Sequence, residues 1–118
     1  MNKKLAALIA ICAFSLVAPF STASAAVFVG YATITNLNVF DSAGIARLQI
    51  DGDNSQNPAS CSSSGQYAID LSSTAGSEMY RLALASYLSG REVRLSIKDT
   101  TGLCANNYPK IDVLYVQD

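Results

Sequence analysis

Short segments of this chain alternate between apolar and polar residues, which is the pattern of β-strands with one buried face. These segments are residues 27–40, 45–51, 66–71, 92–98 and 111–117. The side chains expected to face the core are Ala46, Leu48, Ile50, Tyr67, Ile69, Leu71, Val93, Leu95 and Ile97. The pattern therefore predicts a protein built mainly of five strands.

The segments between these strands carry turn and loop residues. Asp41 and Gly44 bracket a four-residue turn, since Asp favours the first position of such a turn and Gly the fourth. The first two strands should therefore form a hairpin. Residues 52–65 and 99–110 are polar and are expected to be long loops.

One segment has helical spacing. Thr74 or Ser77 can cap its start, and Gly90 marks its end. Its apolar side chains form two adjacent rows, Met79, Leu82, Ala83 and Tyr87 in one and Tyr80, Leu84 and Leu88 in the other. A helix that lies on one sheet needs a single apolar face. Two interpretations stay open: the helix plugs a small barrel and is covered on most sides, or its second row contacts neighbouring subunits.

The order of these elements predicts the fold. The chain has three strands, then a helix, then two strands. This is the order of an OB-fold, which is a five-stranded, partly open barrel. We therefore expect an all-β protein with one helix, folded as a small five-stranded OB-fold-like barrel with the chain order β-β-β-α-β-β. The helix would lie at the bottom of the barrel.

The first 25 residues have the organisation of a secretory signal peptide. Lys3 and Lys4 precede an apolar run from residue 5 to residue 20, and Ala23-Ser24-Ala25 fits a cleavage site. A membrane anchor is disfavoured, because a span needs roughly 20 apolar residues. A lipoprotein signal at Cys12 is also disfavoured, because Ile11 stands where a small residue is needed. We expect a secreted or periplasmic protein.

Residues 26–118 have the length of one small domain with one core. Removal of the signal peptide takes away Lys3 and Lys4. The remaining domain then has 6 of the 8 basic side chains and all 9 acidic ones, which gives a net charge of about −3. Arg91, Arg94 and Lys98 are the only basic cluster, and acidic residues interrupt it. A nucleic-acid partner is therefore not expected, because phosphate binding needs a basic stripe.

Two cysteines remain in this domain, Cys61 and Cys104. An even number of cysteines in an exported chain predicts a disulfide. By chain entropy, a bridge that closes a loop of this length contributes roughly 4 kcal/mol to stability.

The residues disfavour catalysis and metal binding. The chain has no histidine, so neither a Ser-His nor a Cys-His nucleophile pair can form. Residues 51–57 resemble the start of a calcium loop, but Gln56 and Ser62 occupy the positions where an EF-hand needs Gly and Glu. We expect no enzyme activity, no cofactor and no metal site.

A family resemblance is carried by the run LALASYLSGREVRLSI, residues 82–97, and by YPKIDVLYV, residues 108–116. Together with the signal peptide, the OB order and one disulfide, these runs resemble the B subunits of bacterial A–B toxins. The resemblance is strongest to the subtilase-cytotoxin and pertussis-like branch, in which a helix with an aromatic residue near its end precedes an alternating strand with basic outward residues. It covers the helix and the fourth strand best, about twenty residues.

This resemblance implies a homopentamer with its helices around a central pore, glycan binding on the barrel sides and a toxin A chain as a partner. The sequence lacks the segment that precedes the first strand in that branch and contributes sugar contacts. No sugar-binding residue is therefore carried over from the family.

The residues themselves suggest a location for a sugar. Asn106, Asn107 and Tyr108 combine amides with an aromatic ring in the loop before the last strand, and Asp53, Asn54 and Asn57 lie in the other polar loop. The disulfide should hold the two loops together. An ordinary Asn-rich turn, with Tyr108 packed on the barrel rim, is the other interpretation of this loop.

Two functions stay open. The chain is either an oligomeric, glycan-binding subunit, or a structural or inhibitory periplasmic protein whose barrel binds no sugar.

Overall fold

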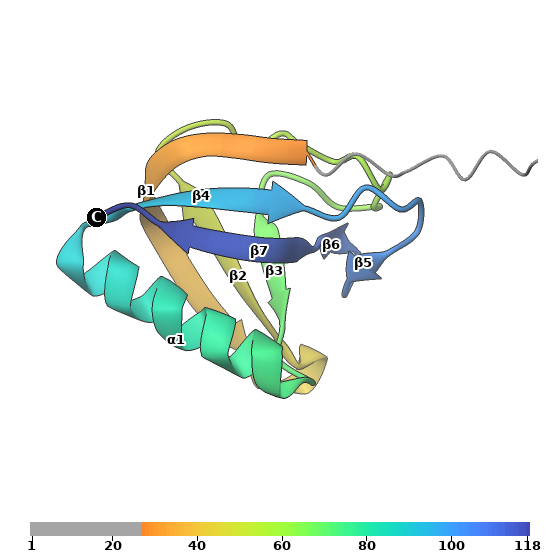
Figure 1. Cartoon of the computed structure of the whole chain (residues 1–118). Coiled ribbons are helices and arrows are strands. Elements are labelled where there is room, and N and C mark those ends of the chain that lie inside the picture. Colours follow the sequence, from red (N-terminus) through yellow and green to blue (C-terminus); the bar gives the residue numbers. More distant parts are fainter. Residues whose placement is uncertain (1–26) are drawn as a thin grey trace, which may run out of the picture.

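The computed structural model describes residues 27–118, so the predicted signal peptide and Cys12 lie outside the described residues. The chain forms a curved five-stranded antiparallel sheet, one helix beside it, and a small two-stranded sheet at one end (Figure 1). The elements are β1 (Val27–Phe40), the 3-10 turn η1 (Asp41–Ala43), β2 (Ile45–Ile50), β3 (Tyr67–Asp70), α1 (Thr74–Ser89), β4 (Glu92–Ile97), β5 (Cys104–Ala105), β6 (Tyr108–Pro109) and β7 (Ile111–Val116).

The long strand β1 holds the sheet together, because it pairs with a different neighbour along each half. Its first half pairs with β4 and its second half with β2, which gives the spatial order β3-β2-β1-β4-β7. The β1–β2 hairpin confirms the predicted turn. Gly44 ends this turn with a φ of 61°, a left-handed conformation that glycine adopts without a steric penalty.

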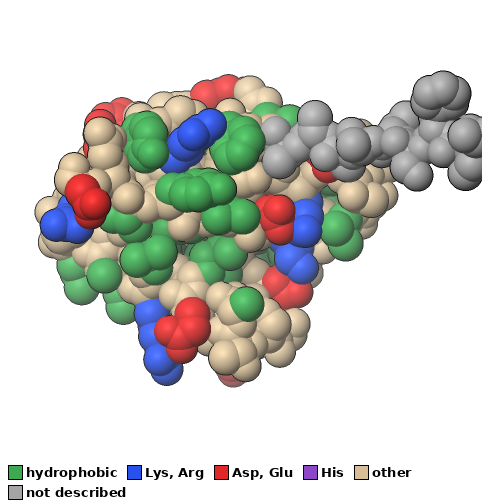
Figure 2. Space-filling model, in the orientation of Figure 1, with side chains coloured by type: hydrophobic (Ala, Val, Ile, Leu, Met, Phe, Trp, Pro, Cys, Tyr) green, Lys and Arg blue, Asp and Glu red, His purple; other side chains and the backbone are tan. Residues whose placement is uncertain are grey.

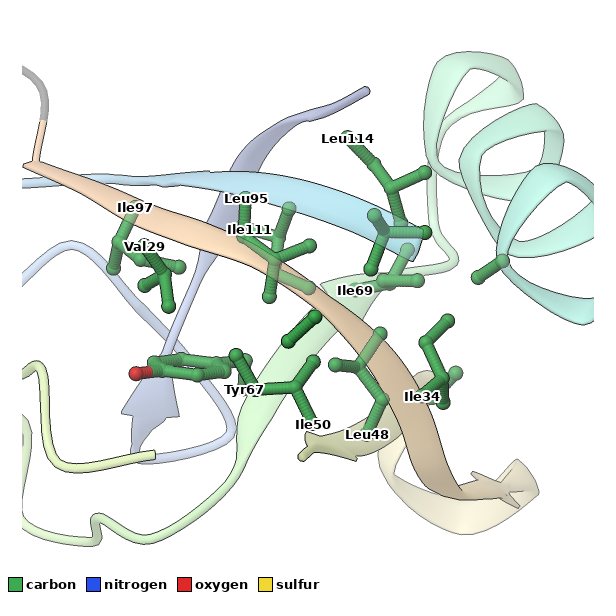
Figure 3. Close-up of a cluster of buried hydrophobic side chains, with 14 residues drawn as sticks. Val29, Ile34, Leu48, Ile50, Tyr67, Ile69, Leu95, Ile97, Ile111 and Leu114 are labelled. Carbon is green, nitrogen blue, oxygen red and sulfur yellow. The ribbon is translucent and has the colours of Figure 1, made fainter. Parts of the chain in front are cut away.

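The core fills the concave side of the curved sheet (Figure 3). The alternation predicted its members correctly, since Leu48, Tyr67, Val93, Leu95 and Ile97 are each 0% exposed. The other large members are Val29, Ile34, Ile50, Ile69, Ile111 and Leu114. Figure 3 shows these side chains pointing toward one another from all five strands of the large sheet.

Helix α1 contacts β1, β3, β4 and β7, and so packs against the side of the sheet where the core lies. Its N-cap is Ser73, whose hydroxyl accepts the Gly76 N–H at 3.0 Å, so the cap lies one residue before the predicted Thr74. Gly90 ends the helix as predicted, with a φ of 69°.

The packing face of α1 combines residues from both predicted rows. Ala83 is buried, and Met79 and Tyr80 pack against the core. Leu82 and Leu88 remain 42% and 74% exposed. The helix therefore has one buried face and one exposed apolar surface, and it is not covered on most sides.

Two parts of the fold prediction need correction. The sheet does not close into a barrel: within residues 27–118, β3 is joined to the residue before β7 by one isolated parallel bridge, between Ala68 and Lys110. The chain order β-β-β-α-β-β is also incomplete, because β5 and β6 form a hairpin inside the expected loop 99–110. This hairpin forms because Asn106 and Asn107 both adopt positive φ, which a two-residue turn requires.

The disulfide between Cys61 and Cys104 is present, with a Cα–Cα distance of 5.9 Å. It fixes β5 to the polar loop of residues 51–66. Two backbone hydrogen bonds reinforce this contact, from the Gly102 N–H to the Ala59 carbonyl and from the Ser63 N–H to the Asn107 carbonyl, both at 2.9 Å.

Candidate functional site

Large apolar side chains are exposed on the outer face of β1, β4 and β7 (Figure 2). We call this surface the aromatic face, and it consists of Phe28, Tyr31, Arg94, Val113 and Tyr115. The three aromatic side chains are 43–48% exposed. Aromatic residues and arginine are the types enriched where proteins bind other molecules.

The register of the strands brings these side chains together. Phe28 of β1 and Val113 of β7 both lie opposite Ser96 of the central strand β4, and Tyr115 lies opposite Arg94. Val29, Ala32, Leu95 and Leu114, which adjoin members of the aromatic face in the chain, are core residues, so the aromatic face lies on the opposite, outer face of the sheet. Ser96 is only 2% exposed, because larger side chains flank it on both sides.

Arg94 is stacked within this face. Its guanidinium carbon lies 4.2 Å from the ring centroid of Phe28, and the Phe28 and Tyr115 rings are 6.4 Å apart with an angle of 43° between their planes. Stacking restrains the guanidinium while leaving its edges free to donate hydrogen bonds. The face therefore offers ring surfaces and a fixed charged donor side by side.

A β-bulge places Tyr31 on this surface. The β1–β4 register shifts between Val29 and Ala32, so β1 contains one more residue than β4 at this point, next to Gly30 and Tyr31. Bulges of this kind redirect a side chain and often occur beside functional sites. A second register shift, at Asp112 of β7, lies on the other side of β4, where Asp112 forms an ion pair with Lys98 at 2.6 Å.

Sequence reasoning missed the aromatic face because it followed only the residues that point inward. Residues 27–31 and 111–116 have apolar side chains on both faces of their strands. This pattern could have revealed the aromatic face from the sequence. A strand with one solvated face should carry polar residues there. Phe28, Tyr31, Val113 and Tyr115 depart from this rule.

The predicted loop site is arranged differently. Asn106 and Asn107 are exposed at the tip of the β5–β6 hairpin. Tyr108 is half buried: it packs against Ala68 and Ala105, its hydroxyl accepts a hydrogen bond from Arg47, and the Arg47 guanidinium lies 4.6 Å from its ring centroid. One ring face of Tyr108 is thus already in contact with a side chain of the protein.

The other three predicted residues bond mainly to their own loop. The Asn54 amide bonds both the N–H and the carbonyl of Ile50, and the Asn57 amide does the same for Cys61, with all four distances at 2.8–2.9 Å. The Asp53 carboxylate accepts from Ser55 and Gln56. These amides and this carboxylate therefore stabilise the loop.

The structure brings only part of the predicted set together. The disulfide at Cys61 holds the middle of the polar loop, with Asn57, beside the β5–β6 hairpin. Asp53 and Asn54 lie at the start of the loop, next to the end of β2 and over the buried Tyr67, whose hydroxyl donates to the Asp53 carbonyl at 2.7 Å.

Two ionisable groups of this loop have shifted pKa values. Hydrogen bonds from Ser55 and Gln56 lower the pKa of Asp53 below its ordinary value of 3.8. Burial raises the pKa of Tyr67 from 10.0 to about 12. Both groups keep their ordinary charge state at neutral pH, so neither shift produces a group ready to exchange a proton there.

A second exposed apolar surface lies on α1. We call it the helix surface, and it consists of Leu82, Ala85, Tyr87 and Leu88. A groove of about 380 Å³ adjoins it, lined by Leu82, Ala85, Ser86, Ser89, Arg91 and Val116. Hydrophobic side chains over α1 are visible below the strands in Figure 2.

Residues 27–118 contain no group of three or more cysteine, aspartate and glutamate side chains placed to hold a metal ion. None of the helices formed by these residues is long and apolar enough to cross a membrane. Comparison with known proteins finds no protein-family model, no curated protein and no solved structure that matches this chain.

Proposed function

We propose that this chain is a secreted, non-catalytic binding module that assembles into a homo-oligomer and binds glycans through the aromatic face. The observation that carries the proposal is the Arg94 guanidinium stacked on Phe28 between exposed tyrosines. Sugars present apolar C–H faces and a rim of hydroxyl groups. The aromatic rings can stack on the C–H faces, and the fixed guanidinium can donate hydrogen bonds to the hydroxyl groups.

The aromatic face has about the size of a small glycan. From their exposed fractions, its four apolar side chains together expose about 300–350 Å². An area of this size suits a glycan of a few residues.

The strand order supports an OB-like interpretation of the fold. In the order β3-β2-β1-β4-β7, the first strand lies between the second and the fourth, and the bridge from Ala68 to Lys110 lies at the junction where an OB barrel would close. Under this proposal the sheet is an OB-like barrel that remains open along β3 and β7.

Secretion and assembly complete the proposal. An internal disulfide is compatible with a location outside the cytoplasm. The helix surface supplies an exposed apolar face on which copies can pack. By the family resemblance, the ring would contain five copies and carry a toxin A chain. Several sugar sites on one ring would act together, so weak single contacts would give useful affinity.

A glycan array with the purified secreted protein tests this proposal. Tyr31→Ala and Arg94→Gln should each weaken binding roughly tenfold or more at a single site, because each removes a contact of about 1.4 kcal/mol. Leu103→Ala is the matched control: Leu103 is 40% exposed and lies outside both the aromatic face and the helix surface, so its loss should leave sugar binding and assembly unchanged.

Sugar binding at the loop site predicted from the sequence would give the opposite result in these variants. If sugar lies on Asn106, Asn107 and Tyr108, then Tyr108→Ala abolishes binding and Tyr31→Ala leaves it intact. An array on which the wild-type protein binds no glycan would contradict the proposal and favour a structural or inhibitory protein.

A further inference from the structure

Two arginines differ from the other basic residues of the described chain. Four of its six basic side chains lie within 4.0 Å of a carboxylate, namely Arg81, Arg91, Lys98 and Lys110. Among residues 27–118, Arg47 and Arg94 form no such ion pair, and both stack on aromatic rings. Arg94 belongs to the aromatic face, whereas Arg47 lies on β2, on the outer face of the other half of the sheet.

Arg47 is held between two rings. Its guanidinium carbon lies 3.8 Å from the ring centroid of Phe40 and 4.6 Å from that of Tyr108. One of its N–H groups donates to the Tyr108 hydroxyl, and its Nε is buried without a hydrogen-bond partner. The side chain is therefore fixed during folding, and a ligand would not have to order it.

The residues around Arg47 form a polar grid. Across the β1–β2 pair, Asn38 lies opposite Arg47, and Asn36 lies opposite Gln49. Side chains at directly opposed positions are close neighbours. The grid of Asn36, Asn38, Arg47 and Gln49 therefore combines three amides and one guanidinium on a single surface, and none of its members is a carboxylate.

The chemistry of the grid selects a ligand class. A guanidinium without a carboxylate partner attracts an anion, and its planar donors match a carboxylate better than a spherical ion. Within the grid, Asn38 donates to the Asn36 amide oxygen, and Gln49 donates to the Gly65 carbonyl at 3.1 Å. The Asn36 amide N–H groups and the Asn38 and Gln49 amide oxygens remain as donors and acceptors for the hydroxyl groups of a sugar. The guanidinium and the amides together therefore favour a ligand that carries both a carboxylate and hydroxyl groups.

We propose that the polar grid is a binding site for a carboxylate-bearing sugar, with the carboxylate on Arg47 and the hydroxyl groups on Asn36, Asn38 and Gln49. This site is separate from the aromatic face and does not depend on it. Phe40 and Tyr108 are positioning residues, because they act by fixing the guanidinium.

Amide-resolved NMR titration of the secreted protein with sodium glucuronate tests the proposal. Acetate supplies the carboxylate alone and glucose supplies the hydroxyl groups alone. Glucuronate should produce saturable shifts at Asn36, Asn38, Arg47 and Gln49 in the millimolar range. Each control compound should bind at least tenfold more weakly.

Two variants sharpen the test. Asn38→Asp places a carboxylate opposite Arg47 and should abolish glucuronate binding without disturbing the fold. Arg47→Lys keeps the charge but loses the planar donors, and it should weaken binding at least tenfold. Gln117→Glu adds the same charge as Asn38→Asp at an exposed position near the end of the chain, and it should bind glucuronate as the wild type does.

The proposal fails if glucuronate produces no saturable shift, or if acetate binds the grid as tightly as glucuronate does. It also fails if the shifts concentrate on Arg94, Tyr31 and Tyr115 in place of the grid. That last result would support sugar binding at the aromatic face, so the two proposals can be told apart.

Discussion

At the scale of single residues, Tyr67 connects the core to the polar loop. Its ring is fully buried, while its hydroxyl donates to the Asp53 carbonyl and accepts the Gln56 N–H. The loop is therefore anchored on a core side chain as well as by its own Asn54 and Asn57 amides. This explains why a long polar segment can keep one conformation above the core.

Tyr67→Phe should lower the free energy of unfolding by about 1 kcal/mol, because it removes these hydrogen bonds and keeps the ring. Thermal melts at neutral pH would measure the loss. Tyr31→Phe, which removes the hydroxyl of a side chain that is 48% exposed, is the control and should stay within about 0.5 kcal/mol of the wild type. Equal melting temperatures for Tyr67→Phe and the wild type would contradict the anchoring role.

The same residue predicts a dependence on alkaline pH. Burial raises the folded pKa of Tyr67 to about 12 from 10.0, so the folded chain retains this proton where the unfolded chain loses it. Its contribution to stability is complete below pH 10 and is lost as pH rises toward 12. Melting temperatures of the wild type and Tyr67→Phe should therefore converge between these pH values, and a constant difference would contradict the shifted pKa.

Gly76 is required where α1 approaches the end of β3. A Cβ added there would overlap the carbonyl oxygen of Asp70, which is backbone and cannot move aside alone. Gly76→Ala should therefore cost about 3 kcal/mol or more, measured by denaturant unfolding. Gly30→Ala is the control, because a Cβ at Gly30 meets no atom within 4 Å. A Gly76→Ala protein with wild-type stability would show that the contact is not rigid.

At the scale of elements, the β5–β6 hairpin depends on contacts outside itself. It consists of two residue pairs, too few for an independent hairpin. The disulfide fixes its first strand, and Tyr108 packs it against Ala68 and Ile45. Its position determines where Tyr108 meets Arg47.

Replacing both Cys61 and Cys104 with serine should lower stability by about 4 kcal/mol, because the unfolded chain regains the freedom of a long loop. Hydrogen exchange should increase most in β5 and β6 and least in β4. In the wild-type protein neither cysteine should react with a thiol reagent before reduction. Labelling of both thiols in freshly isolated protein would contradict the bridge.

At the scale of the whole molecule, the two exposed apolar surfaces suggest different partners. The aromatic face lies on the sheet and carries a fixed charge, whereas the helix surface is made of aliphatic and aromatic side chains without one. The aromatic face suits a polar ligand that has apolar faces. The helix surface suits packing against the helix surface of another copy of the chain, where aliphatic side chains can be fully buried.

Leu88→Glu should convert the expected ring into monomers, because Leu88 is 74% exposed in the single chain and contributes little to its core. Light scattering and native mass spectrometry would measure the assembly, and circular dichroism should show an unchanged fold. Thr101→Glu, a charge in an exposed loop, is the control. A wild-type protein that stays monomeric at high micromolar concentration would contradict the assembly.

The sequence alone determined the parts of this protein that depend on local chemistry. Strict alternation identified the inward residues of β2, β3 and β4, because a strand places every second side chain on the same face. Gly44 and Gly90 marked a turn and a helix end through their tolerance of positive φ. The disulfide followed from two cysteines in a chain expected to be exported.

Only the tertiary structure decided which surfaces are exposed and which side chains meet. Register brought Phe28, Arg94 and Tyr115 together from three strands, and it placed Asn38 opposite Arg47. The β5–β6 hairpin put Tyr108 against Arg47, and the loop amides turned to their own backbone. Apart from those of the loop amides, these contacts join residues that are distant in the chain, so no local pattern encodes them.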